Sequence, residues 1–171
     1  ESIIKNKYKK KISNLYLTKL PLSKIISKNK SKTENIKIMK KKHINYKISL
    51  LAKKCILKTD ILIFAPGTQF SSLYPTYMSK GLNKTILQNK KILKILFINI
   101  LRENDTYNFK IVDFINQALN YLSIYGANLR EDFFNHILIN RFNDSKKKNK
   151  FIISNLTNTS FDKKIIVDKF A

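Results

Sequence analysis

Two short, continuous apolar runs constrain the fold of this chain most strongly. Residues 61–65 read ILIFA, and residues 92–101 read ILKILFINIL. The first run is too short for a helix, is apolar on both alternating faces and is closed by Pro66-Gly67. This is the pattern of a strand buried on both sides, and the second run repeats its character. A third strand candidate, FFNHILIN, covers residues 133–140.

Amphipathic patterns separate these apolar runs. Apolar residues recur at helical spacing before the first run, between the first and second over residues 77–90, and between the second and third. Strand and helix alternation at this spacing predicts βαβ units, and hence an α/β fold whose parallel sheet is covered on both faces. Cys55 lies on the first apolar helix face and is predicted to belong to the core. The residues that carry the three helical patterns are Ile48, Leu51, Ala52, Cys55 and Ile56; Met78, Leu82 and Ile86; and Ile111, Phe114, Ile115, Ala118, Leu119 and Leu122.

The two ends of the chain are less regular. Residues 1–34 show no sustained period, and ENIKIM at 34–39 alternates as a short strand would. Near the other end, FIISN at 151–155 and KKIIVD at 163–168 predict further short strands. We therefore predict a basic N-terminal segment over 1–44, irregular or peripheral, and an α/β portion over 45–171.

The charge is large and uneven. Lys and Arg total 34 against 11 Asp and Glu, a net charge of +23, and residues 1–58 alone hold 18 Lys and two acids, a net of +16. Such a balance suggests a nucleic-acid or anionic-membrane partner. However, the surplus is almost all Lys, accompanied by abundant Ile and Asn, as drift toward an AT-rich genome also produces. The Lys runs have few aromatic residues between them, which is unlike a single-strand binding site. A basic nucleic-acid-binding module without catalysis stays open as the alternative function.

Cysteine and histidine content excludes several kinds of site. Cys55 is the only cysteine, so the chain has no internal disulfide and no cysteine-cluster metal site. His43 lies in a Lys run and is predicted to be solvated, while His136 lies in a strand candidate and is predicted to be structural. No metal site is predicted from these residues alone. There is no 18-residue apolar run and no signal-peptide pattern, so we expect a cytoplasmic protein without a membrane partner.

The segment APGTQFSSLYP, residues 65–75, follows the first predicted strand. In an open α/β sheet ligands bind at the carboxyl ends of the strands, where loops lead into helices. Gly67 permits positive φ and close backbone approach, and Pro75 suits the first turn of the next helix. Free backbone N–H groups there favour an anion such as phosphate. The alternative is a plain tight turn whose serines cap the helix, and chemistry alone does not separate the two. The residues predicted to bind phosphate are Pro66, Gly67, Thr68, Gln69, Ser71 and Ser72, together with Asn99 at the end of the second strand.

Other motifs and acidic pairs refine this expectation. The chain has only three glycines, Gly67, Gly81 and Gly126, so neither a Walker motif nor a GxGxxG fingerprint is present. Glu103 and Asp105 follow Asn99 and are predicted as possible contacts to ligand or metal. Glu131 and Asp132 are explained by helix capping or solubility.

Two segments resemble the CofD/YvcK-like family, which includes 2-phospho-L-lactate transferases and gluconeogenesis factors. The first segment, residues 59–86, reads TDILIFAPGTQFSSLYPTYMSKGLNKTI. It is similar to the family segment in which Ala-Asp, an apolar run and GPGS or GPGT are followed by TS or SS, a Pro and a helix that contains KGI. FINILRENDTYNFKIVDFINQAL, residues 97–119, is similar to its next strand, polar loop and helix. The resemblance covers roughly 45–125. The matching positions are Thr59-Asp60, Ala65-Pro66-Gly67-Thr68, Ser71-Ser72, Pro75, Lys80-Gly81-Leu82, Asn99 and Val112-Asp113.

The resemblance implies a Rossmann-like three-layer α/β/α fold and a nucleotide or nucleotide-sugar ligand. Its transferase members join phospholactate from a nucleoside diphosphate donor to a deazaflavin precursor, so magnesium with a nucleoside diphosphate is the cofactor it suggests. The family's glycine-rich N-terminal turn and nearby acidic positions are absent, and Ala65 replaces the first glycine of GPG. The chain therefore resembles the C-terminal half of the family's domain, with a preceding segment or partner chain expected. Whether it catalyses, and through which residues, is unknown at this point.

Overall fold

The strands that the structure describes form one parallel sheet. The computed structural model describes residues 12, 14–99, 103–106, 108–130, 132–140 and 165–168. Four strands pair in chain order: β1 (Ile61–Phe64), β2 (Leu93–Phe97), β3 (His136–Asn140) and β4 (Ile165–Asp168). The α/β class, the parallel sheet and the three predicted strands are confirmed, and β4 falls within the predicted 163–168. The strand predicted at 151–155 lies outside the described residues.

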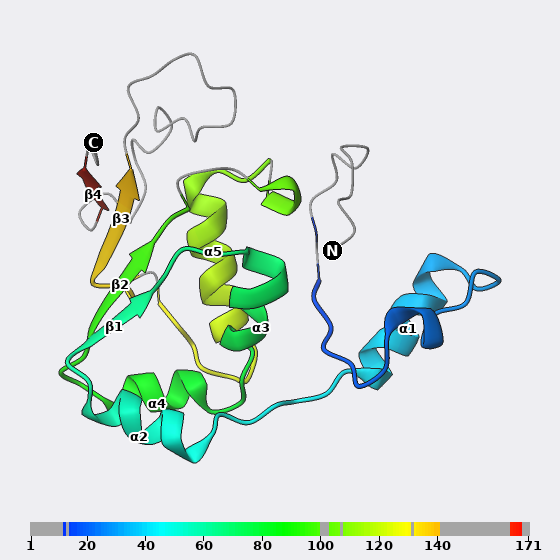
Figure 1. The fold of residues 1–171 in the computed structure, drawn as a ribbon, viewed down its shortest axis with the longest axis horizontal. Helices are drawn as coiled ribbons and strands as arrows, with labels where there is room; N and C mark the ends of the chain where they lie inside the picture. Colours follow the sequence, from blue (N-terminus) through cyan, green and yellow to red (C-terminus); the bar gives the residue numbers. More distant parts are fainter. Residues whose placement is uncertain are drawn as a thin grey trace, which may run out of the picture.

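Four helical segments lie on one side of this sheet (Figure 1). They are α2 (Leu50–Lys58), α3 (Tyr74–Tyr77), α4 (Leu82–Gln88) and α5 (Ile111–Leu122), and the π-helix η2 (Gln69–Leu73) leads into α3. Of the helix predicted over 77–90, only Tyr77, the last residue of α3, and α4 itself are helical, because Gly81 takes a left-handed conformation, with φ of 94°, immediately before α4. The two helical segments can then change direction between β1 and β2.

The core lies between the sheet and these helices. Phe64, Leu96 and Ile137 are register partners on neighbouring strands, and each is at most 5% exposed. From the helical side, Tyr74 and Tyr121 stack with ring centroids 4.6 Å apart. Both rings are almost fully buried, so they join the sheet residues in one continuous apolar cluster.

The first strand is not buried on both sides as predicted. β1 is an edge strand that pairs only with β2 in the described sheet, and Ile61 and Ile63 are 52% and 53% exposed. The residues of β1 are apolar on both faces, but burial of the second face also requires another part of the molecule to cover it. The described helices lie on one face of the sheet (Figure 1), and helical cover of the second face stays a prediction.

The prediction that Cys55 belongs to the core is also wrong. The side chain is exposed on α2. This nine-residue helix contributes no fully buried residue and packs mainly against α4, with Ile56 partly buried against the core. The neighbouring helix α4 therefore covers only part of the apolar face of α2, and Cys55 lies in the part that stays exposed.

The N-terminal segment contains a helix where a strand was predicted. Residues 34–39 lie inside α1 (Lys32–Lys42), which follows the short 3-10 turn η1 (Leu22–Lys24). Ser31 and Glu34 form a reciprocal capping box: the Ser31 hydroxyl accepts the Glu34 N–H at 3.2 Å, and the Glu34 carboxylate accepts the Ser31 N–H at 2.8 Å. Figure 1 shows α1 to the side, away from the sheet. The boundary at residue 44 stays a prediction. Among the described helices, none has the length and apolar character needed to cross a bilayer.

Candidate functional site

The predicted phosphate loop lies at the carboxyl end of β1, where it connects the strand to η2 (Figure 1). Its backbone leaves the sheet after Phe64, and the side chains of Thr68, Ser71 and Ser72 are exposed. Gln69 is the exception, because its side chain turns inward and is only 6% exposed. The loop thus presents hydroxyl groups outward while one amide anchors it inside.

Asn99 holds this loop through both the oxygen and the nitrogen of its side-chain amide. The Gly67 N–H donates to Asn99 Oδ1 at 3.0 Å, and Asn99 Nδ2 donates to the Gly67 carbonyl at 2.8 Å. Gln69 Nε2 donates to the same carbonyl at 3.1 Å and to Asn99 Oδ1 at 3.3 Å. The structure therefore brings together three predicted residues from loops that follow neighbouring strands. Since its amide is engaged by the loop, Asn99 positions the loop, and direct contact of Asn99 with a ligand stays a prediction.

Glu103 extends this cluster toward the loop after β2. Its Oε1 accepts a hydrogen bond from Asn99 Nδ2 at 3.1 Å, while its Oε2 is buried and has no hydrogen-bond partner among the described residues. Burial raises the pKa of the Glu103 carboxyl, the nearby Asp105 carboxylate raises it further, and the Gln69 backbone N–H opposes this in part. The two predicted carboxylates therefore lie close to each other and to the loop.

Gly67 does not adopt the positive φ that its residue type allows. Among the described glycines only Gly81 and Gly126 do so. A Cβ atom built at Gly67 would meet the Leu73 side chain at 3.5 Å, an ordinary van der Waals contact. Neither backbone conformation nor packing within the described chain therefore requires glycine at this position.

The predicted alternative, in which serines of this loop cap the following helix, is wrong. Ser71 and Ser72 lie inside η2, and neither η2 nor α3 has a side-chain cap. Thr68 Oγ1 and Ser72 Oγ are 3.4 Å apart, so these two hydroxyls are neighbours at the surface. Pro75 lies in the first turn of α3, as predicted.

The remaining candidates lie elsewhere. His136 begins β3, at the end of the strands opposite to the loop, and Asp132 is exposed with its carboxylate 3.7 Å from Arg130 Nε. Glu131 lies outside the described residues. Within the described ranges no group of three or more His, Cys, Asp or Glu side chains is arranged to hold a metal ion.

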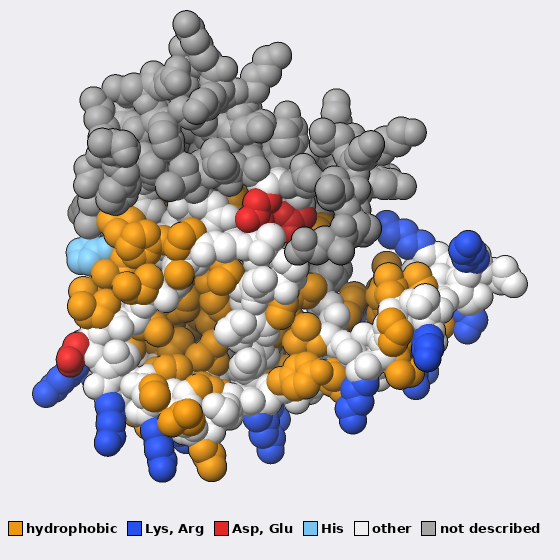
Figure 2. All heavy atoms as spheres, in the orientation of Figure 1, with side chains coloured by type: hydrophobic (Ala, Val, Ile, Leu, Met, Phe, Trp, Pro, Cys, Tyr) orange, Lys and Arg blue, Asp and Glu red, His pale blue; other side chains and the backbone are white. Residues whose placement is uncertain are grey.

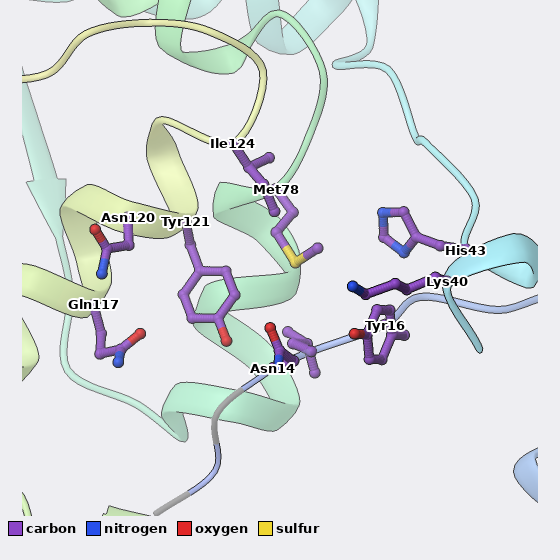
Figure 3. Close-up of a pocket in the computed structure, with 10 residues that line it drawn as sticks. Asn14, Tyr16, Lys40, His43, Met78, Gln117, Asn120, Tyr121 and Ile124 are labelled. Carbon is purple, nitrogen blue, oxygen red and sulfur yellow. The ribbon is translucent and has the colours of Figure 1, made fainter. Parts of the chain in front are cut away.

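A hollow of about 360 Å³ lies apart from the loop. Figure 3 shows side chains of α5 facing those of the N-terminal segment and α1 across it, with Met78 between them. His43 was predicted to be solvated, and this is wrong: the ring is half-buried, its Nδ1 accepts the Leu17 N–H at 3.0 Å, and it contacts the Tyr16 ring. Residues far apart in the chain form this hollow, so no local spacing in the sequence pointed to it. Its lining comprises Asn14, Leu15, Tyr16, Lys40, His43, Met78, Gln117, Asn120, Tyr121 and Ile124, and includes no predicted ligand-binding residue.

Comparison with known proteins identifies the family. No curated protein matches the chain. A crystal structure of protein BH3568 from Bacillus halodurans matches with 19% sequence identity and a TM-score of 0.48, over 71% of this chain and 35% of that one. The chain therefore spans about a third of the length of that relative. The family described as 2-phospho-L-lactate transferase CofD matches over residues 22–169. Because that match extends over most of the sequence, the chain belongs to the CofD family.

Proposed function

We propose that the chain binds a phosphate-bearing nucleotide or nucleotide sugar at residues 66–72, as part of a CofD-type phospholactate transferase or a related sugar-nucleotide protein. The observation that carries this proposal is the double hydrogen bond between the Asn99 amide and the Gly67 peptide. It fixes the loop at the carboxyl end of β1, the position where parallel α/β sheets bind ligands. The family assignment supports the same ligand class.

The geometry of the loop suits an anion. Because the side-chain amides of Asn99 and Gln69 hold the loop from inside, its hydroxyl groups are exposed to solvent and can act as donors. These hydroxyls belong to Thr68, Ser71 and Ser72. The first hydrogen bond of η2 runs from the Ser72 N–H to the Thr68 carbonyl at 3.2 Å. Because the Gly67 N–H donates to Asn99 and the Gln69 N–H to Glu103, the exposed hydroxyls are the donors that this proposal assigns to the anion. The missing side chain of Gly67 leaves room for a ligand beside the backbone.

Magnesium fits this site only together with a ligand. Two carboxylates, Glu103 and Asp105, lie beside the loop, and Mg²⁺ in phosphate sites is held by one or two carboxylates and the phosphate oxygens. When bound, the ion would neutralise part of the diphosphate charge. The residues that would contact it are these two carboxylates.

The test is a thermal-shift screen of the purified chain against nucleoside diphosphates and nucleotide sugars, with and without magnesium, at moderate salt. A ligand at one hundred times its dissociation constant stabilises by about 2.7 kcal/mol, which raises the Tm of a chain of this size by roughly 5–11 °C. We expect this shift to disappear in Gly67→Val, because the added side chain occupies the space beside the loop. A Cβ at this position makes only ordinary contact with Leu73, and circular dichroism of Gly67→Val verifies that the variant is folded.

The matched controls are hydroxyl deletions. Thr68→Val should weaken the shift, whereas Thr33→Val, at an exposed threonine of α1, should leave it unchanged. An equal shift in wild type and Gly67→Val, or an equal shift with inorganic pyrophosphate, would overturn the proposed site.

A further inference from the structure

The hollow between α5 and the N-terminal segment has the size of a small-molecule site. Its volume of about 360 Å³ lies at the lower end of the roughly 300–1,000 Å³ that such sites occupy. One wall comes from residues 14–16 together with Lys40 and His43, and the other comes from α5 and Met78. A ligand held there would therefore contact both the N-terminal segment and the core of the protein.

The buried part of the lining is apolar and aromatic. Met78 is 1% exposed and Tyr121 is 7% exposed, and both side chains belong to the hydrophobic core. Leu15, which is partly buried against the same core, and Ile124 add aliphatic surface. A thioether beside tyrosine rings favours an aromatic partner, because both sulfur and ring edges make favourable contacts with aromatic rings. The deeper part of the hollow therefore suits an aromatic ring.

Hydrogen-bond donors converge on the hollow from both walls. Figure 3 shows the hydroxyl groups of Tyr16 and Tyr121 and the ammonium group of Lys40 pointing toward the space between α5 and the N-terminal segment. Burial raises the pKa of Tyr121, and the nearby Tyr16 raises it further, so the Tyr121 hydroxyl keeps its proton at neutral pH. This hydroxyl has no hydrogen-bond partner among the described residues, although its side chain is more than nine-tenths buried. A ligand oxygen would supply the missing acceptor.

The imidazole of His43 adds a further donor. Its Nδ1 accepts the Leu17 N–H at 3.0 Å, so the neutral ring carries its proton on Nε2. In Figure 3 the ring faces Met78 across the hollow. The bond to Leu17 also holds the backbone that follows residues 14–16, and it thereby fixes the wall opposite α5.

The charges around the hollow favour an anion. No Asp or Glu is among its lining residues, whereas Lys40 supplies one positive charge and has no ion-pair partner in the described part of the chain. Figure 2 shows Lys and Arg side chains over α1, while the Asp and Glu side chains visible in that view lie elsewhere. Because one ammonium group balances one negative charge, a carboxylate fits better than a phosphate dianion.

We propose that this hollow binds a small aromatic carboxylate. The carboxylate pairs with Lys40 and accepts hydrogen bonds from the hydroxyls of Tyr16 and Tyr121, and the ring packs against Met78. The loop after β1 contributes no residue to the hollow. The site therefore stands independently of the ligand proposed for that loop.

The test is fluorine NMR of small probes with the purified chain, at moderate salt to screen general attraction to the lysine-rich surface. The probes are 4-fluorobenzoate, 4-fluorophenylacetate and 3-(4-fluorophenyl)propanoate, each compared with its neutral primary amide. We expect at least one acid to bind saturably and about tenfold or more tightly than its amide, because the amide loses the charged hydrogen bonds. Binding should also slow hydrogen exchange over residues 34–42, since the ligand links α1 to α5.

Matched variants then locate the bound probe. Lys40→Gln should weaken binding of the acid about tenfold, and Tyr121→Phe, which removes only the hydroxyl, should weaken it several-fold. Lys41→Gln is the control, because Lys41 is exposed on the same helix and does not line the hollow, and it should leave the affinity unchanged. Circular dichroism and Tm verify that each variant is folded.

Three results would overturn the proposal. The first is failure of all three acids to bind saturably. The second is equal affinity for each acid and its amide, which would show that the negative charge is not recognised. The third is an affinity that stays unchanged in folded Lys40→Gln and Tyr121→Phe, which would place the probe elsewhere on the protein.

Discussion

At the scale of single residues, Asn99 is the side chain on which the candidate site depends. It is 8% exposed and links the loop after β1 to the loop after β2 through its amide. Gln69, itself buried, completes the cluster. Sequence reasoning selected all of these positions because they follow apolar strands, but it assigned them to a ligand. The structure adds that they bind one another.

Replacing Asn99 should therefore destabilise the fold as well as the loop. Asn99→Ala leaves the Gly67 peptide without its side-chain partner, which costs about 1–3 kcal/mol. The Tm should fall by roughly 2–12 °C for a chain of this length. Asn116→Ala is the matched control, because Asn116 is exposed on α5 and its replacement should be nearly neutral. The hydrogen-exchange rate of residues 66–72 should increase only in Asn99→Ala. Equal exchange rates in the two variants would contradict the conclusion that Asn99 holds the loop in place.

The pKa of Glu103 predicts a pH dependence of stability. Its folded-state pKa is raised by burial first and by Asp105 second, so folding favours the protonated form. The resulting penalty is absent below the ordinary Glu pKa, grows as pH rises from about 4.3 through the folded value, and is fully present above it. Glu103→Gln should therefore raise Tm at pH 7 and have little effect below pH 4.

Glu34 provides a control of opposite sign. Its pKa is lowered, chiefly by the hydrogen bond from the Ser31 side chain, so its contribution is favourable at neutral pH and is lost on acidification. Glu34→Gln should not raise Tm at pH 7. If both variants shift Tm in the same direction at neutral pH, the assigned environment of Glu103 is incorrect.

At the scale of elements, the N-terminal helix α1 depends on its cap. The helix is strongly basic and buries no residue, so little tertiary packing supports it. Its last turn carries three lysines, which suit the negative end of a helix dipole. Its first turn is fixed by the reciprocal hydrogen bonds of Ser31 and Glu34.

Removing this cap should unfold α1 locally. Ser31→Ala should destabilise the helix by about 1 kcal/mol, the usual value for an N-cap serine. Faster hydrogen exchange over residues 34–42, with unchanged exchange in α5, is the expected readout. Ser23→Ala, an exposed serine in η1, serves as the control. Uniform protection of α1 in both variants would show that contacts other than the cap hold the helix.

The elements that sequence reasoning missed had weak or competing local signals. ENIKIM alternates as a strand does, but SKTE at 31–34 is a capping-box signature that marks a helix start. The helix over 77–90 was predicted as one piece because its apolar spacing continues through Gly81. By contrast, α5 was predicted with its observed bounds because its apolar face is wide and fully buried. The cover of β1 was not predictable locally, since exposure of Ile61 and Ile63 depends on what lies beyond the strand.

At the scale of the whole molecule, the charge predicts general attraction to polyanions. With a net charge of +23, the chain should bind single-stranded nucleic acid at low salt, with an affinity that falls steeply as salt rises. This attraction should be the same in wild type and Gly67→Val, because it arises from distributed lysines. A binding titration at several salt concentrations tests it. A nucleic-acid affinity that depends on Gly67, or that is insensitive to salt, would contradict this account.

The order of the strands also has a consequence for biosynthesis. Because every strand of the sheet pairs with the strand next to it in the chain, no pairing must wait for a distant segment to be made. Such pairing closes shorter loops than a parallel sheet of shuffled strand order would, and it should therefore fold faster than such a sheet. The β1–β2 unit can therefore assemble while the ribosome is still translating β3 and β4, and the sheet grows strand by strand in the direction of synthesis.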